Sequence, residues 1–190
     1  MRIIVAITGA SGVIYGITLL EVLRKLEVET HLILSRRAEE IIALETSLTA
    51  ADMRALTPHV YSESNFNAPV ASGSFLHQGM VIAPCSMKTL AGIAAGYAEN
   101  LIQRAADVTI KERRRLVLVP RESPFSAIHL ENMLQLSRLG VVIAPPVPAF
   151  YNRPKTIAEL VEFSVGRILD LLGVENELFQ RWGGIPGGET

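Results

Sequence analysis

The chain has 190 residues, of which 49% are hydrophobic, and its 18 Lys and Arg residues nearly balance 19 Asp and Glu residues, giving a formal net charge of -1. This length suits one domain with a full hydrophobic core, and the near-neutral charge excludes a general electrostatic attraction to nucleic acid or to an anionic membrane surface. The mean hydropathy of +0.31 is high, but no apolar run approaches about 20 residues, the length of a membrane-spanning helix, so we expect the excess apolar surface to be buried in a homo-oligomer.

The first part of the chain alternates strand-like and helix-like segments. Residues 2–8 form a β-branched run, and apolar positions at helical spacing follow the glycine-rich turn after it. Residues 30–35 predict a second short strand, and residues 36–45 predict a second helix. The periodicity weakens over 49–74, where Asn, Ser, Pro and Gly accumulate, so we interpret this stretch as a functional loop.

The alternation continues in the rest of the chain. The predicted strands are 80–84, 116–120 and 141–144, and the predicted helices are 87–98, 101–111, 125–137 and a last one from Thr156 to about Leu172. The last helix opens on Thr156-Ile157-Ala158-Glu159, a capping box in which each end supplies the other's missing hydrogen bond.

Short apolar strands that alternate with helices indicate an α/β protein with a three-layer, Rossmann-like (flavodoxin-like) doubly wound parallel sheet in a single domain. We expect this domain to span 1–182 and the glycine-rich tail 183–190 to be flexible. In such sheets, ligands bind beyond the carboxyl ends of the strands, which makes the residues at those ends the first candidates for a site.

The turn Thr8-Gly9-Ala10-Ser11-Gly12 lies between the first strand and the first helix, where backbone N–H groups and the helix dipole favour a phosphate. Its spacing is not G-x-G-x-x-G, and no acid ends the second strand, so NAD is disfavoured. Arg36 and Arg37 suit a 2′-phosphate, which keeps NADP as a weaker interpretation. A tight turn without a ligand stays open as well.

Further candidates follow later strands. Ser35 ends the second strand, and Pro84-Cys85-Ser86-Met87-Lys88-Thr89 joins a later strand to a helix, so both lie at the ligand-binding edge. The hydroxyls of Ser86 and Thr89 suit a ribityl phosphate, helix capping or both. Arg121 and Glu122 directly follow the strand 116–120, which makes them stronger candidates than charges on a helix face.

For several charged or aromatic residues, the sequence allows two interpretations. Arg104 and Lys111 share a helix face about 10 Å long, as a solvated ladder or as an anion-binding face. By its spacing, Glu45 is an ordinary exposed helix-end acid. Tyr151 is either a packed aromatic residue or a hydroxyl at a loop mouth, and Arg167 is either a surface arginine or an anion clamp.

The lone Cys85 cannot form an internal disulfide, and no cleavable leader precedes the first strand, so we expect a cytoplasmic protein. We interpret Cys85 as a small buried residue rather than a nucleophile. His77 and His129 share no ligand spacing with other residues, so no metal is expected.

Taken together, seven short runs resemble the UbiX/Pad-type flavin prenyltransferases. They cover nearly the whole chain in the family's order: 8–12 (TGASG), 44–46 (LET), 83–86 (APCS), 104–107 (RAAD), 111–114 (KERR), 120–122 (PRE) and 150–151 (FY). The resemblance implies a Rossmann-like subunit of a homododecamer with sites where subunits meet. It also implies transfer of a dimethylallyl group from dimethylallyl monophosphate to reduced FMN without a metal, making the prenylated FMN that UbiD-type decarboxylases use in ubiquinone biosynthesis or aromatic acid decarboxylation.

The resemblance also assigns residues. FMN is expected to contact Gly9, Ala10, Ser11, Ser35, Ser86, Met87, Lys88, Thr89 and Arg121. The prenyl phosphate is expected to contact Phe66, Ser72, Gly73, Arg104, Lys111, Tyr151 and Arg167. The catalytic residues are expected to be Ser11, Glu45, Glu122 and Tyr151. Phe66 departs from the Trp of some relatives and gives a smaller aromatic wall.

Two other functions remain as alternatives. One is an FMN-dependent decarboxylase of the related cysteine-decarboxylase group, although no clear match to the Asn-containing substrate-clamp motifs of that group is found. The other is a non-catalytic flavin carrier that delivers the cofactor to a decarboxylase.

Overall fold

The computed structural model describes residues 1–184. Within them, no helix combines the length and the apolar character that crossing a membrane requires. Of the predicted flexible tail, only Gly183 and Gly184 belong to the described part of the chain, and the remainder, 185–190, lies outside it.

Residues 1–184 contain six strands and seven helices, with one or two helices after each strand except β3. The strands are β1 Arg2–Ile7, β2 Glu29–Leu34, β3 His59–Ser62, β4 Gly79–Cys85, β5 Arg115–Pro120 and β6 Val142–Ile143. The helices are α1 Val13–Lys25, α2 Arg36–Glu45, α3 Ala50–Arg54, α4 Met87–Ala94, α5 Leu101–Lys111, α6 Ala127–Arg138 and α7 Ile157–Leu172, with a 3-10 turn at Pro69–Ala71.

All strand pairs are parallel, and their order across the sheet is β3-β2-β1-β4-β5-β6. This order confirms the predicted doubly wound sheet, because the chain first winds outward from β1 to β3 and then crosses to β4 on the other side of β1. The crossing makes the gap between the ends of β1 and β4 the topological switch point, where ligands bind in this architecture.

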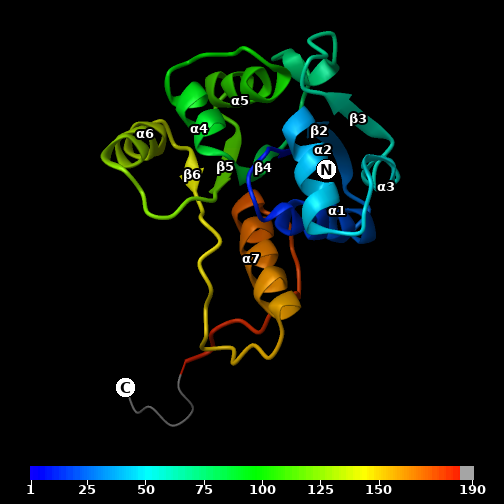
Figure 1. Cartoon of the computed structure of the whole chain (residues 1–190), viewed down its shortest axis with the longest axis vertical. Helices are drawn as coiled ribbons and strands as arrows, with labels where there is room; N and C mark the ends of the chain where they lie inside the picture. The colour runs from blue at the N-terminus through cyan, green and yellow to red at the C-terminus, as the bar shows by residue number, and fades with distance from the viewer. Residues whose placement is uncertain (185–190) are drawn as a thin grey trace.

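Alternate residues of each strand serve two separate cores, as a buried parallel sheet requires. Ile3, Val5 and Ile7 of β1 belong to the core on one face, which α1, α2, α3 and α7 cover. Ile4 and Ala6 belong to the core on the other face, under α4, α5 and α6 (Figure 1). The three predicted layers are therefore present.

The prediction of a loop over the stretch 49–74 is wrong in part. This stretch contains the short helix α3 and the edge strand β3. Thr49 and Asp52 form a capping box for α3, a sequence pattern that could have revealed this helix. The predicted box of the last helix is incomplete, because Glu159 accepts a hydrogen bond from the Lys155 amide instead of the Thr156 amide.

The predicted helix 87–98 is too long, since α4 ends at Ala94. Gly96 has a φ of 68°, a left-handed conformation that ends helices and that glycine adopts without strain.

Gly16 allows α1 to approach the sheet closely. A Cβ at this position would overlap the carbonyl oxygen of Ala83 and would lie 2.8 Å from Cδ1 of Ile7. We therefore expect Gly16→Ala to lower the free energy of unfolding by about 1–3 kcal/mol, despite a gain in helix propensity of at most about 1 kcal/mol. Urea unfolding would measure the loss. Gly183→Ala adds the same methyl group where no heavy atom lies within 4 Å and is the control; equal stability of the two variants would contradict the packing argument.

Candidate active site

Thr8 connects the two strands that flank the switch point. Its buried Oγ1 donates to the Pro84 carbonyl at 2.8 Å and accepts from the Ser86 amide, also at 2.8 Å. These bonds hold the turn after β1 beside the segment after β4. The predicted glycine turn and the predicted Ser86 segment thus form one site, although 78 positions separate their residues in the sequence.

A cavity of about 210 Å³ opens at this junction. It is lined by Thr8, Gly9, Ser35, Arg37, Glu63, Ser86, Lys88, Thr89 and Asn100. Five of the residues expected to contact FMN are among them. Met87 is not, because its side chain packs against the core under α4.

Helix capping is one role of the serines in this cavity. Ser35 Oγ accepts from the Ala38 amide at 3.0 Å, at the start of α2. Ser86 Oγ accepts from the Thr89 amide at 3.3 Å, at the start of α4, and lies 3.0 Å from Thr89 Oγ1. Two helix N-termini therefore face the cavity, and their free amides and positive dipole ends favour an anion there.

The sequence did not identify Glu63 or Asn100 as site residues, and it suggested Arg37 only as a ligand of a 2′-phosphate. Asn100 caps α5 through the Gln103 amide, a pattern that the sequence contains. Glu63 accepts from the Arg36 amide at 2.8 Å, and only the pairing of β3 with β2 brings it there. Gly9 lies so close to the Arg37 side chain that any Cβ would overlap it.

Glu45 is not the plain helix-end acid that its spacing suggests. Its carboxylate accepts from the Gly12 amide at 2.8 Å and from the Val13 amide at 3.2 Å, so it caps α1, whose N-cap residue Gly12 has no side chain. The phosphate position expected at these amides is thus already filled by a carboxylate. Sequence spacing could not reveal this contact, because α1 and α2 meet only in the folded sheet.

The protonation of Glu45 follows from these contacts. Burial raises the pKa of its carboxyl group, but hydrogen bonds from the Ser11 side chain and from the Gly12 and Val13 amides, together with the charge of Arg121, hold the pKa below its ordinary value. Glu45 is therefore an ionised acceptor at neutral pH, beside two other predicted site residues, Ser11 and Arg121.

Arg121 and Glu122 line a neighbouring cavity of about 530 Å³, walled by Phe125 and the proline-rich segment 145–148. Glu122 accepts from the Ser123 amide at 2.9 Å. Both side chains are exposed, as expected for residues that directly follow a strand at the ligand-binding edge.

The helix α5 carries a second group of predicted residues. Arg104 donates from Nε to the Ala71 carbonyl at 3.1 Å and forms an ion pair with Asp107 at 2.8 Å. Lys111 forms an ion pair with Glu112. The loop 72–74 packs on this pair, since a Cβ on Gly73 would lie 2.8 Å from the Lys111 ammonium. Arg104, Lys111 and the loop therefore lie together, and both interpretations of α5, ladder and anion-binding face, remain compatible with the contacts.

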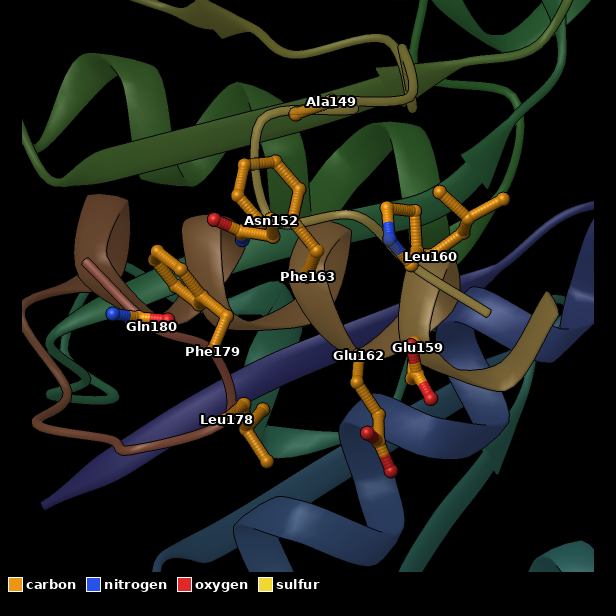
Figure 2. A pocket seen from close by; sticks show the side chains of 10 residues that line it. Ala149, Asn152, Glu159, Leu160, Glu162, Phe163, Leu178, Phe179 and Gln180 are labelled. Atoms are coloured by element: carbon orange, nitrogen blue, oxygen red, sulfur yellow. The ribbon is translucent and has the colours of Figure 1, made fainter. Parts of the chain in front are cut away.

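Tyr151 and Arg167 form a third group around α7. Tyr151 packs edge-on against Phe163 and Trp182, at centroid distances of 5.8 and 5.5 Å. Arg167 forms an ion pair with Asp170 at 2.9 Å. Close by, α7 and the segments before and after it enclose a cavity of about 160 Å³, in which the rings of Phe163 and Phe179 meet edge-on at a centroid distance of 4.8 Å (Figure 2).

Within residues 1–184 of one chain, the predicted cations do not surround a single cavity. Arg121, Lys111 and Arg167 line three different ones. Phe66, the predicted aromatic wall, is 46% exposed. A single chain thus brings together the cavity at the switch point and leaves the predicted prenyl phosphate residues in separate groups.

Two features lie outside these groups. Cys85 is fully buried, and burial raises the pKa of its thiol, so it has no nucleophilic character. Glu29, His31 and His59 cluster near the amino ends of β2 and β3. Their possible ligand atoms lie within 4.8 Å of one another. The guanidinium of Arg2 pairs with Glu29 at 2.7 Å, and both nitrogens of His31 already contact Tyr61 and Glu29 at 3.0 Å.

Comparison with known proteins gives close relatives. The chain matches the Flavoprotein family model over residues 1–169. It is 56% identical to the protein named flavin prenyltransferase PAD1, mitochondrial, of Saccharomyces cerevisiae over 184 residues, which are 97% of this chain and 76% of the yeast protein.

Two solved structures superpose on almost the whole chain. One is AnUbiX (PadA1) in complex with FMN and dimethylallyl pyrophosphate, with a TM-score of 0.95 and 53% identity over 97% of this chain and 98% of that chain. The other is a dodecameric FMN-dependent UbiX-like decarboxylase from Escherichia coli O157:H7, with a TM-score of 0.95 and 52% identity over 97% of this chain and 100% of that chain.

The cysteine-decarboxylase group shares only the fold with this chain. The peptidyl-cysteine decarboxylase EpiD is 15% identical, with a TM-score of 0.65 over 90% of this chain and 97% of that chain. The family match and the identity to a flavin prenyltransferase over nearly the whole sequence show that this chain belongs to the Flavoprotein family and, within it, to the UbiX-type flavin prenyltransferases.

Proposed function

We propose that this chain joins a dimethylallyl group from dimethylallyl monophosphate to reduced FMN, and that the prenylated FMN serves a UbiD-type decarboxylase. The observation that carries the proposal is the cavity at the switch point, where two capped helix N-termini and the side chains of Arg37 and Lys88 suit the phosphate of FMN. The related AnUbiX structure, in complex with FMN and dimethylallyl pyrophosphate, supports the pairing of FMN with a dimethylallyl donor.

The groups of cations suit the leaving group. Breaking the allylic carbon–oxygen bond develops positive charge on the prenyl unit and a second negative charge on the phosphate. Arg104, Lys111, Arg121 and Arg167 stabilise that phosphate by charge-assisted hydrogen bonds. These four fixed cations supply the charge that a metal provides in other phosphate sites, so the reaction requires no metal.

Glu45, Ser11, Glu122 and Tyr151 handle protons in this scheme. Glu45 is ionised and lies next to Ser11, so it accepts a proton during ring closure through or beside that hydroxyl. Glu122 and Tyr151 orient or protonate the departing phosphate. Gly9, Ala10, Ser35, Ser86 and Thr89 hold the flavin. Met87, whose side chain packs against the core, contributes only its backbone at the start of α4. Phe66, Ser72 and Gly73 border the prenyl group.

Neighbouring subunits complete each site. In one chain, Lys111, Arg121 and Arg167 line three separate cavities. The helix α7, which carries Arg167, packs against Tyr151 through Phe163 and not against Glu45. The helix α6 also exposes Ile128, Leu130 and Leu134, and Leu139 follows directly after it, each exposed by more than half of its surface; copies of the chain would cover such apolar surface. The dodecameric relative supports a homododecamer. The single thiol and the absence of a spanning helix within residues 1–184 are compatible with a cytoplasmic enzyme of ubiquinone biosynthesis or aromatic acid decarboxylation.

The first test is product formation. The purified protein, incubated anaerobically with reduced FMN and dimethylallyl monophosphate in the presence of EDTA, is expected to release phosphate and to give a flavin heavier by one prenyl unit in mass spectrometry. A parallel arm contains dimethylallyl pyrophosphate. An unchanged flavin mass in both arms would reject the transferase and favour a flavin carrier, whereas decarboxylation of a cysteine-terminated peptide would favour the cysteine-decarboxylase function.

The second test addresses shared sites. Glu45→Gln and Arg167→Ala subunits, each nearly inactive alone, are co-expressed with different tags and purified as mixed oligomers. If Glu45 of one copy and Arg167 of another serve one site, some sites in the mixture contain both native residues, and activity returns well above that of either parent. Mixed oligomers as inactive as their parents would place the complete site within one chain.

The third test concerns Glu45. Glu45→Gln is expected to lower kcat about 100-fold or more and to change the Kd for FMN by less than about threefold, since the residue acts on proton transfer; equal losses would contradict this role. Because the pKa of Glu45 is lowered from 4.5, its carboxylate stabilises the fold above that pH and ceases to do so as the pH falls through the lowered value.

The same variant therefore has a stability signature. Its deficit in the free energy of unfolding, about 0.5 kcal/mol for an exposed helix cap at pH 7, should shrink as the pH falls below 4.5 in urea unfolding at one protein concentration. Glu175→Gln, which neutralises an exposed carboxylate after α7, is the control and should show no such pH-dependent deficit.

A further inference from the structure

Arg114 is the last residue of the run 111–114, and the proposed function gives it no role. Its half-buried guanidinium donates from Nη1 to the Phe75 carbonyl and from Nη2 to the Gly73 carbonyl, both at 2.8 Å. A planar guanidinium has two parallel donors in a fixed geometry, so this contact fixes both the position and the direction of the loop backbone.

The end of α5 explains why Arg114 reaches this loop. The Arg113 amide donates to the Ile110 carbonyl and the Arg114 amide to the Thr109 carbonyl, both at 2.9 Å. Arg113 itself is left-handed, with a φ of 54°. This is a Schellman ending, which reverses the chain within one residue. As a result, Lys111 before the reversal and Arg114 after it both contact the segment 73–75.

The contacts of Lys111 show what the loop position controls. Gly73 packs so closely on the Lys111–Glu112 ion pair that a Cβ would lie 2.5 Å from the Glu112 carboxylate and 2.8 Å from the Lys111 ammonium. Arg104 donates to the Ala71 carbonyl at 3.1 Å, at the start of the same loop. The loop therefore fills the space beside both α5 cations, and its position limits where the Lys111 ammonium can lie.

We propose that Arg114 is a positioning residue, which clamps the loop 71–75 against α5 so that Lys111, Arg104 and the Ser72-Gly73 backbone present one preformed surface to the prenyl phosphate. This assignment rests on the proposed function for its substrate. It predicts that loss of the clamp weakens binding of the prenyl phosphate and leaves FMN binding intact, since the FMN cavity is lined by other residues.

The test compares Arg114→Gln and Arg114→Lys with Arg113→Asn in the FMN-loaded protein. Arg113 is exposed and makes no side-chain hydrogen bond within residues 1–184, and Asn tolerates its left-handed backbone, so Arg113→Asn removes the same charge without touching the loop. We expect KM for dimethylallyl monophosphate to rise about tenfold in Arg114→Gln and less in Arg114→Lys. The kcat and the Kd for FMN should change by less than about threefold, and Arg113→Asn should behave like the native protein.

Two further measurements exclude a merely structural role. In Arg114→Gln, the amide hydrogen exchange of the segment 71–76 should be faster than in the native protein, and the exchange rates of the other segments should be unchanged. This measurement does not depend on enzymatic activity. Gly73→Ala leaves Arg114 in place but pushes the Lys111 side chain aside, which costs little stability because the overlapping atoms are ends of flexible side chains. It should raise KM in the same way.

The outcomes separate the two proposals. A native protein that makes no prenylated FMN rejects the proposed function, and this assignment with it. An active native protein whose Arg114→Gln variant keeps its KM, or loses FMN affinity and thermal stability in proportion to KM, overturns the positioning role alone. If the segment 71–76 exchanges at the native rate in Arg114→Gln, Arg114 does not clamp the loop, whatever the activity of the variant.

Discussion

The hydrogen bonds of Thr8 across the gap between β1 and β4 are the contacts on which the rest of the site depends. Parallel strands leave a crevice wherever the winding direction changes, but a crevice alone does not fix two loops relative to each other. One buried hydroxyl donates to the Pro84 carbonyl near the end of β4 and accepts from the Ser86 amide at the start of α4, so a single side chain joins the two loops. The turn after β1 and the start of α4 thereby form one rigid wall, and α2 completes the cavity through Ser35 and Arg37.

The ion pairs of the predicted cations are suited to being exchanged for a substrate phosphate. Arg167 pairs with Asp170, whose side chain is 17% exposed and also pairs with Arg181. Arg104 and Lys111 pair with carboxylates three residues and one residue away, and both side chains of each pair are a third or more exposed. Such exposed pairs contribute only about 0–1 kcal/mol, so a phosphate dianion competes for these cations at little cost. The pairs keep the free protein from accumulating uncompensated positive charge, and the same side chains become strong donors once solvent is excluded from them.

The sequence predicts the elements wherever periodicity is strong. The bounds of α2 and α5 agree with the prediction, and β1, β2, β4 and β5 agree within a residue or two, because their apolar patterns reflect burial on both faces. The pattern fails for β3, an edge strand of four residues that is only half buried, since one partner strand and little core contact leave no strong signature. It also fails for contacts between segments distant in the sequence. The capping of α1 by Glu45 and the place of Glu63 at α2 depend on how helices and strands meet, whereas Ser35, Ser86 and Arg121 could be predicted because they follow strands directly.

In the proposed reaction, the high apolar content has a role besides folding, because it can keep water away from the site. An allylic group that separates from its phosphate reacts with any water that reaches it, so the site must exclude solvent while the bond breaks. In one chain, however, Glu45, Arg121, Glu122, Tyr151 and Arg167 are all exposed. The exposed apolar residues of α6 offer a surface that a neighbouring copy can bury, and the same burial would close the site and bring the cations of another chain to the phosphate. Under the proposed function, assembly of several copies would therefore serve the chemistry directly, since a lone subunit would expose the carbocation to water.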